Sequence, residues 1–201
     1  MTIYIVRHGE TDGNFGGVIQ FPDTPLNPRG LSQAEAVGAR LADAGIRRIL
    51  ASDYARAHTT AEAIGRRAGA PLEIHAGLRE RNFGDLRGRP RTEVGDRMYA
   101  DDFEPPNGES WPVFHDRVAR TWADVVRTAA QAEGDIAIVT HGLVCYSLVL
   151  RQLRLPHGLE PVRGFGNTSV TVVEGRAPWP VTLLNCIAHL DEVIDARGSV
   201  T

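Results

Sequence analysis

Apolar and polar residues follow two alternating patterns along the chain. Short apolar runs predict buried strands at 3–6, 49–51, 72–74, 136–140, 170–173 and 181–184. Longer segments with an apolar residue every three or four positions predict helices at 28–44, 111–126 and 143–153, with a further helix starting near residue 53. This alternation predicts an α/β protein, a three-layer α/β/α sandwich with a mostly parallel central sheet. The last two strands are candidates for an antiparallel hairpin.

Residues that favour helix ends flank the periodic segment 28–44. Asn27 followed by Pro28 is typical of a helix start, because the asparagine side chain can cap the first turn and proline suits its first position. Ser32 and Glu35 offer a rival start, as a capping box. Gly45 is expected to end this helix, since glycine readily adopts the left-handed backbone found there.

Three stretches lack a regular pattern. Residues 12–27 are rich in glycine and proline and predict a loop beside the end of the first strand. Residues 87–109 predict an irregular region that contains a short helix at 94–103. The tail from Asp191 is polar and is predicted to be loose. No stretch has the composition of a linker, so residues 1–201 are expected to form a single domain.

Two histidines follow buried strands directly, and each is followed by a glycine. Arg7, His8 and Gly9 end the first strand, while His141 and Gly142 end the strand at 136–140. A single strand-end histidine would be read as a packing or loop residue. Two in matching contexts, at the edge where α/β sheets place their chemistry, predict a functional site.

The stretch 7–11 reads Arg-His-Gly-Glu-Thr, and Asn14 lies three residues further on. Blocks in the same order follow at 52–61, 78–86, 108–110 and 166–169. Together they resemble the histidine phosphatase superfamily, also called phosphoglycerate mutase-like, in its phosphatase-type branch. The resemblance spans nearly the whole chain, and it implies the phosphoglycerate mutase-like fold.

The resemblance and the chemistry of phosphate esters assign catalytic roles to five residues. His8 is expected to attack phosphorus and form a phosphohistidine. Arg7 and Arg56 are expected to clamp phosphoryl oxygens with planar guanidinium groups, and Arg56 without the resemblance would be read as a surface arginine. His141 is expected to donate a further hydrogen bond, and Glu80 to act as general acid and then as base.

Further residues are expected to contact the substrate. Besides the catalytic residues, Asn14, Gly142 and Asn167 are predicted to line its binding site. Ser52 or Asp53 is expected to cap the helix that carries the second arginine.

Three other carboxylates are alternatives to Glu80 as the acid: Glu10, Asp85 and Glu109. Glu10 is expected to have a structural or rim role near the nucleophile. Glu109 lies in a Gly-Glu-Ser turn that can approach the pocket in the family, and the other interpretation is a carboxylate that complements a helix dipole. The His-Asp pair of the family's other branch is absent, because Gly142 follows the second histidine.

A cluster of basic residues follows the predicted acid. It consists of Arg81, Arg87, Arg89, Arg91 and Arg97. These residues either bind a carboxylate or second phosphate of the substrate, or form a solvated basic loop.

Composition excludes several classes. A net charge of −3 over 201 residues argues against a nucleic-acid-binding surface, and no apolar run is long enough to span a membrane. No targeting segment is visible, so a cytoplasmic protein is expected. Cys145 and Arg151 have the spacing of a cysteine phosphatase loop, but the residues between them contain no glycine and predict a buried helix. Neither Cys145 nor Cys186 suggests a disulfide or a zinc site, and no metal or cofactor is expected.

The sequence therefore predicts a metal-independent phosphomonoester hydrolase that acts on a small phosphorylated metabolite. A cofactor-dependent phosphoglycerate mutase is the alternative, although such mutases carry a longer insertion between acid and second histidine than 80–141 provides. A non-catalytic module that binds phosphoproteins, and a metal-dependent hydrolase, are weaker alternatives. The leaving group is not determined, and the choice between monomer and homodimer stays open.

Overall fold

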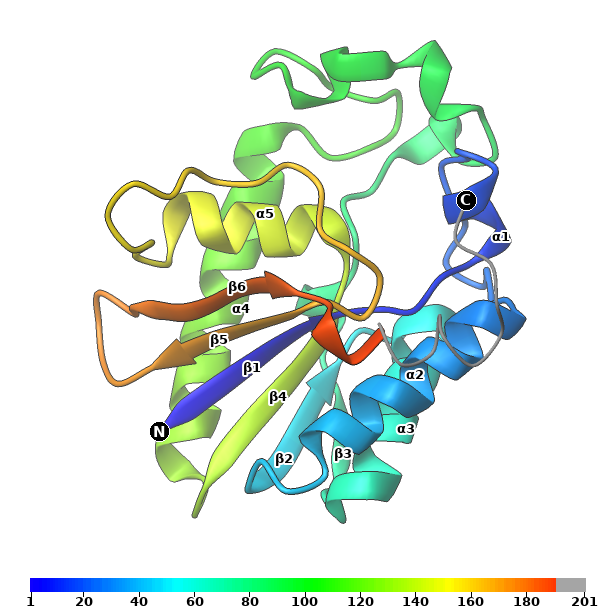
Figure 1. The fold of residues 1–201 in the computed structure, drawn as a ribbon. Coiled ribbons are helices and arrows are strands. Elements are labelled where there is room, and N and C mark those ends of the chain that lie inside the picture. The colour runs from blue at the N-terminus through cyan, green and yellow to red at the C-terminus, as the bar shows by residue number, and fades with distance from the viewer. Residues whose placement is uncertain (191–201) are drawn as a thin grey trace.

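A computed structural model describes residues 1–190, so the predicted loose tail from Asp191 lies outside the described residues. Its six-stranded sheet has the order β3-β2-β4-β1-β5-β6 (Figure 1). The strands are β1 (Thr2–Arg7), β2 (Ile46–Ala51), β3 (Leu72–Ile74), β4 (Asp135–Thr140), β5 (Val170–Glu174) and β6 (Val181–Cys186). Each contains one of the apolar runs predicted to be a strand.

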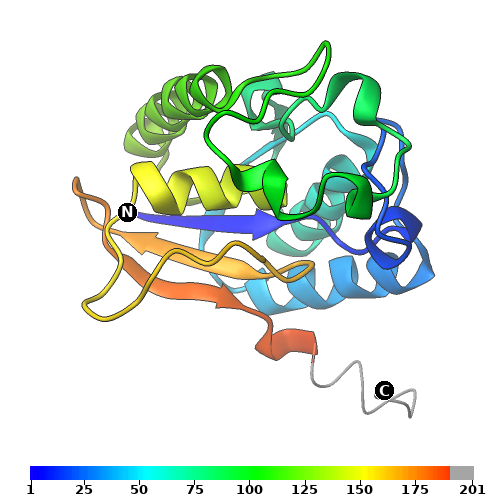
Figure 2. The same cartoon turned by 90° about the horizontal axis from the view of Figure 1, so that it is seen from above.

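Helices cover both faces of the sheet. They are α1 (Asp12–Phe15), α2 (Pro28–Leu41), α3 (Ala55–Ala68), α4 (Trp111–Gln131) and α5 (Gly142–Arg151). One apolar core joins α2 and α3 to side chains such as Val6 and Val139, and another joins α4 and α5 to Ile5 and Ile138. Because successive residues of a strand point to opposite faces, these two cores lie on the two sides of the sheet. Figure 2 shows α4 and α5 on one side of β1 and α2 on the other, which confirms the three-layer sandwich.

The strand directions also confirm the sequence analysis. Neighbouring strands from β3 to β1 run parallel, whereas β5 is antiparallel to both β1 and β6. In the central pair, Arg7 of β1 lies opposite Thr140 of β4. The residues that follow these two strands therefore leave the sheet side by side.

The start of α2 confirms one of the two predicted caps. Asn27 is the N-cap, and its side chain accepts a hydrogen bond of 2.8 Å from the Gly30 N–H. Ser32 instead lies within the helix and bonds the carbonyl of Pro28. Gly45 does not end the helix, which stops at Leu41. It adopts a positive φ of 70° in the turn that leads into β2.

Other predicted boundaries were wrong. The segment 12–27 is not entirely loop, because Thr11 caps the short helix α1. Neither Ser52 nor Asp53 caps α3, whose N-cap is Tyr54 without a side-chain bond. The predicted helix at 94–103 is only a short 3₁₀ helix, Gly95–Tyr99.

No helix within residues 1–190 has the length and apolar character needed to cross a membrane.

Candidate active site

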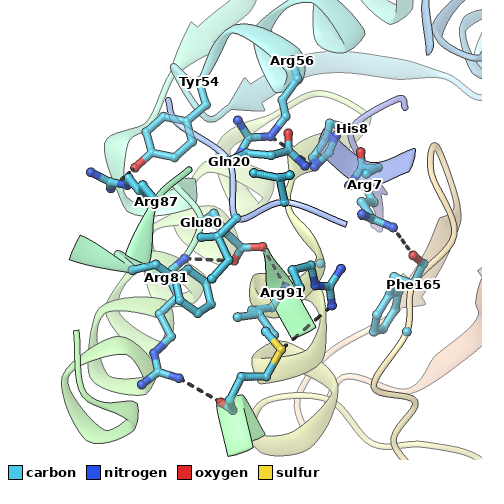
Figure 3. Close-up of a pocket in the computed structure, with 18 of the residues that line it drawn as sticks. Arg7, His8, Gln20, Tyr54, Arg56, Glu80, Arg81, Arg87, Arg91 and Phe165 are labelled. Atoms are coloured by element: carbon cyan, nitrogen blue, oxygen red, sulfur yellow. Dashed lines mark hydrogen bonds between the residues drawn. The ribbon is translucent and has the colours of Figure 1, made fainter. Parts of the chain in front are cut away.

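His8 follows β1 directly and only 3% of it is exposed. Its Nδ1 lies 2.7 Å from the carbonyl oxygen of Gly9, which can only accept a hydrogen bond, so the ring proton is fixed on Nδ1. Nε2 therefore carries a lone pair, to which Arg56 Nε donates from 3.3 Å (Figure 3). The imidazole thus presents its basic nitrogen to a guanidinium group.

The surroundings of His8 keep it neutral. Burial lowers the pKa of His8 well below its usual value, and the positive charges of Arg56 and Arg7 lower it further. The hydrogen bond to the Gly9 carbonyl opposes this shift without cancelling it. A neutral imidazole is the form that can act as a nucleophile.

His141 lies beside His8, with their ring centroids 5.1 Å apart. Its Nε2 is 2.9 Å from Ser52 Oγ. The Ser52 hydroxyl accepts from the Tyr54 N–H and can donate its own proton to Nε2. The ring proton of His141 then sits on Nδ1, which is buried and has no hydrogen-bond partner in the described part of the chain. Burial, followed by the charge of nearby arginines, lowers the pKa of His141 well below its usual value.

Arg7 and Gly142 bring further donors to the site. Arg7 Nη1 donates to the carbonyl of Phe165, while its Nε is buried and unpartnered among residues 1–190. A β-carbon added at Gly142 would lie 3.6 Å from that Nε, so the start of α5 faces the guanidinium group. The Gly142 N–H is at the first position of α5, where no helical carbonyl is available to it. These groups are suited to binding an anion.

Arg56 is buried in the first turn of α3, as the sequence predicted for the second arginine. Besides its contact with His8, its Nη1 donates to the carbonyl of Phe21 from 2.9 Å. Burial lowers the pKa of Arg56 to about 10, so it remains positively charged at neutral pH.

Glu80 lies across the pocket from the two arginines beside His8 (Figure 3). Its carboxylate accepts hydrogen bonds from the Arg81 N–H at 2.9 Å and the Leu143 N–H at 3.2 Å. Burial is the largest influence and raises the pKa of Glu80, although these bonds and the nearby arginines oppose it. A carboxyl group with a raised pKa is suited to giving and taking a proton near neutral pH.

The alternative acids are engaged elsewhere. Glu10 accepts from Asn27 at 3.0 Å and has the structural role that the sequence suggested. Glu109 pairs with Arg117 at 2.8 Å, and this pairing lowers the pKa of Glu109 although burial acts to raise it. Asp85 is exposed, and none of these three carboxylates lines the pocket.

The pocket is a cavity of about 140 Å³. Its lining combines charged, polar and apolar side chains: Arg7, His8, Asn14, Val18, Ile19, Gln20, Tyr54, Arg56, Glu80, Arg81, Phe83, Arg87, Arg91, Met98, Tyr99, Gly142, Leu143, Arg163, Gly164 and Phe165. Since a single water needs about 10–15 Å³ by this measure, the space suits a small metabolite.

The two predicted asparagines have different places. Asn14 lines the cavity, and its Oδ1 accepts from Thr11 and from Asn167. Asn167 does not line the cavity, because its amide donates to the carbonyl of His8 at 3.1 Å and to Asn14 at 3.3 Å. It holds the backbone of His8 from outside the cavity.

The basic cluster divides into three kinds of residue. Arg81 is buried, bonds the carbonyls of 98, 103 and 109, and lies 4.2 Å from the Trp111 ring, so it is structural. Arg89 and Arg97 are exposed and do not line the cavity, and Arg89 pairs with a neighbouring carboxylate. Arg87 and Arg91 line the cavity. Three of the five residues, Arg81, Arg87 and Arg91, therefore lie at the pocket, and the sequence did not distinguish them from their neighbours.

Two other observations bear on the alternatives. Cys145 is buried on α5, and burial raises the pKa of its thiol to about 12, which argues against a nucleophilic cysteine. Within residues 1–190, no three His, Cys, Asp or Glu side chains are grouped as a metal ion would require. The donors that surround His8 instead, from Arg56, Arg7 and the adjacent His141, suit an anion such as a phosphoryl group.

Sequence reasoning missed several residues in the pocket or directly behind it. Tyr54 lies next to the helix start but was not assigned a role, and Ser52 was proposed only as a cap. Tyr99 and Arg163 come from irregular segments with no local pattern to indicate the site. Only the position of Ser52, directly after a buried strand, could have identified it as a site residue.

Fold and site together define an α/β enzyme with a buried, cationic, histidine-containing anion site. A family model described as the histidine phosphatase superfamily (branch 1) matches residues 3–185, and the chain belongs to this superfamily. This match confirms the prediction that the chain is a phosphomonoesterase of the histidine phosphatase type.

Similar proteins are named for different activities. The probable phosphoglycerate mutase GpmB of Citrobacter koseri is 32% identical over 207 residues, with 95% of each chain covered. The structure of a mycobacterial glucosyl-3-phosphoglycerate phosphatase with VO3 is 27% identical, with a TM-score of 0.79 over 92% of this chain and 99% of that one. A phosphoserine phosphatase from Entamoeba histolytica is 25% identical, with a TM-score of 0.77 over 94% and 98% of the two chains.

Proposed function

We propose that this chain hydrolyses small phosphomonoesters through a phosphohistidine on His8, without a metal or other cofactor. The observation that carries the proposal is the fixed tautomer of His8, whose neutral Nε2 lies beside Arg56 at the wall of a cavity that also contains Glu80. Similar structures that are named as phosphatases support hydrolysis as the reaction.

In the first step, His8 Nε2 attacks phosphorus, and the bond between phosphorus and the ester oxygen breaks. Arg7 and Arg56 offset the charge on the phosphoryl oxygens, and His141 Nδ1–H donates a further hydrogen bond. Glu80 gives its proton to the departing alkoxide, which leaves as the alcohol.

In the second step, the Glu80 carboxylate takes a proton from water while the water oxygen attacks phosphorus. The bond between Nε2 and phosphorus breaks, inorganic phosphate leaves, and His8 and protonated Glu80 are restored. Asn14 and the Gly142 N–H act as neutral donors at the edge of the phosphoryl group. Asn167 acts indirectly, by holding the backbone of His8.

A phosphoglycerate mutase is the second candidate, because the Citrobacter koseri relative carries that name. A mutase must return the phosphoryl group to a bound phosphoglycerate before water reaches it. Hydrolysis is favoured here because such mutases carry a longer insertion between the acid and the second histidine, which helps to cover the substrate. The stretch from Glu80 to His141 is too short to provide it. A non-catalytic binding role is disfavoured, since His8, both arginines and the acid are all in place.

Phosphate release from a panel of phosphomonoesters, with a chelator present, tests the proposal. The panel includes 3-phosphoglycerate, whose isomerisation is followed in parallel. We expect chelator-resistant release from the wild type, none from His8→Ala, and normal release from His157→Ala, which removes an exposed histidine outside the cavity. Intact-mass analysis after rapid quenching is expected to detect the phosphorylated wild-type protein.

Each other outcome identifies a different function. Isomerisation faster than release would make the chain a mutase. Activity lost on chelation would indicate a metal-dependent hydrolase, and retained activity in His8→Ala would exclude the phosphohistidine. A folded protein without either activity, but with tight binding of a phosphopeptide, would be a binding module. Four further expectations stay predictions. They are the cytoplasmic location, the single domain over 1–201, the monomer or homodimer state, and the lack of nucleic-acid and membrane partners.

A further inference from the structure

The cavity holds more positive charge than the proposed reaction uses. Besides the two arginines beside His8, its lining includes Arg81, whose guanidinium group is engaged by three backbone carbonyls, and Arg87, Arg91 and Arg163. Glu80 is the single carboxylate among the lining residues, and it is protonated when the ester bond breaks. One phosphoryl group needs only the cations next to the nucleophile, so three guanidinium groups are left over.

These three guanidinium groups have no anionic partner in the described part of the chain. Arg87 donates to the neutral hydroxyl of Tyr54 at 3.4 Å. Arg91 reaches only the sulfur of a methionine, at 4.0 Å, and Arg163 lies 5.0 Å from the ring centre of Tyr99. None of the three forms an ion pair with a carboxylate of residues 1–190.

The backbone holds these arginines in place around the cavity. Residues 87–91 pair with 17–19 through three backbone hydrogen bonds of 2.7 to 3.0 Å. The hydroxyl of Tyr99 donates to the carbonyl of Arg163 at 3.2 Å, which ties the two irregular segments together. In Figure 3, Arg91 lies on the side of the pocket opposite His8. These hydrogen bonds hold the segments that carry the three arginines at the cavity, while the side chains of Arg91 and Arg163 are exposed.

The spare cations also act on the phosphoryl end of the pocket. Burial lowers the pKa of Arg7, and the charge of Arg91 adds to this effect. Burial likewise lowers the pKa of Arg56, and Arg87 contributes in the same direction. An anion placed among these groups would relieve their mutual repulsion.

We propose that Arg87, Arg91 and Arg163 form a second anion subsite, which binds a carboxylate or a second phosphate of the substrate. The inference rests on the proposed function and narrows its substrate to small phosphomonoesters that carry another anionic group. Guanidinium forks suit both kinds of anion, and the apolar lining residues such as Ile19 and Phe165 suit the carbon skeleton between the two groups.

Two matched substrate pairs test the subsite. In the first pair, 3-phosphoglycerate has a carboxylate where glycerol 3-phosphate has an alcohol. In the second pair, fructose 1,6-bisphosphate has a second phosphate where fructose 6-phosphate has an alcohol. We expect the wild type to favour the more charged member of one pair about 100-fold in kcat/KM. Each of Arg87→Gln, Arg91→Gln and Arg163→Gln is expected to lower that ratio about tenfold, the effect of losing one charge-assisted hydrogen bond. The pair that shows the preference identifies the anion.

Arg89→Gln is the matched control, because Arg89 is exposed, pairs with Glu93 at 2.8 Å and does not line the cavity. It is expected to leave both ratios unchanged. Equal hydrolysis of both members of each pair, or an unchanged ratio in the three variants, would overturn the subsite while the phosphatase stands. If no ester is hydrolysed, calorimetric binding of the same pairs to His8→Ala still decides the subsite, separately from the failed activity.

Discussion

At the scale of single residues, the hydrogen bond between the Ser52 hydroxyl and His141 Nε2 favours the tautomer of His141 that carries its proton on Nδ1. We expect Ser52→Ala to lower kcat about 10- to 100-fold, because His141 Nε2 loses its partner and the Nδ1–H tautomer is no longer enforced. Nitrogen-15 NMR of the histidine rings is expected to show the tautomers of His141 mixing. An unchanged kcat together with an unchanged tautomer would contradict this role.

The role that we propose for Glu80, as the general acid, makes the effect of its loss depend on the leaving group. In Glu80→Gln, we expect the first step to slow about 10²–10⁴-fold for alkyl phosphates, which need a proton on the departing oxygen. The burst of p-nitrophenolate from p-nitrophenyl phosphate should change much less, since that group leaves without protonation. Rapid-mixing kinetics on both substrates measure the difference.

The pH dependence provides the control for this assignment. The first step needs protonated Glu80, so with alkyl phosphates the wild-type rate is expected to fall as pH rises through the raised pKa of Glu80. It also needs neutral His8, whose lowered pKa places the acidic decline below the usual histidine range. A rate that rises steadily above neutrality would rule out Glu80 as the acid.

At the scale of secondary-structure elements, α2 offers a matched test of helix capping. Asn27→Ala removes the bond to the Gly30 N–H and the bond to Glu10, and we expect it to lower the free energy of unfolding by about 1 kcal/mol or more. Ser32→Ala is the control, since Ser32 is half-buried within the helix and does not cap it, and we expect it to change the free energy of unfolding by less than about 0.5 kcal/mol. Urea unfolding measures both. A larger loss of unfolding free energy in Ser32→Ala than in Asn27→Ala would favour Ser32 as the cap, in the capping box with Glu35.

The elements that could be predicted from the sequence depend on local patterns. The apolar runs before His8 and His141 identify buried strands, and parallel neighbours bring the residues after both strands to one edge. The cap of α3 could not be predicted, because Ser52 and Asp53 both favour capping locally. Instead Ser52 bonds His141, which lies 89 residues away. Long-range contacts override local preference at this functional position.

The pocket wall was beyond prediction for the same reason. The bond from Tyr99 to the Arg163 carbonyl joins residues 64 apart, and neither segment has a periodic pattern. Arg81 also looked like its exposed neighbours, although it is 1% exposed and packs on Trp111. Residue type alone does not distinguish a guanidinium group that supports the fold from one that faces the cavity.

At the scale of the whole molecule, two buried neutral histidines make stability depend on pH. Burial holds the pKa of His8 well below 6.5, so below that pH the unfolded chain binds a proton that the folded chain does not. The free energy of unfolding should therefore lose up to about 1.4 kcal/mol per pH unit for each such group, from pH 6.5 down to its folded pKa. We expect His8→Asn to show a correspondingly shallower decline in urea unfolding between pH 6.5 and 5. Equal slopes in the two proteins would mean that His8 is protonated when folded.

The strand order has a consequence for how the protein is made. β4 lies between β1 and β2, so β1 has no neighbour in the sheet until residues 135–140 have left the ribosome, and its other neighbour, β5, emerges later still. The first two thirds of the chain thus hold a strand that cannot pair, and late non-local pairing of this kind is slow. Because His8 meets His141 only when β4 is inserted, a growing chain is expected to gain phosphatase activity only near the end of its synthesis.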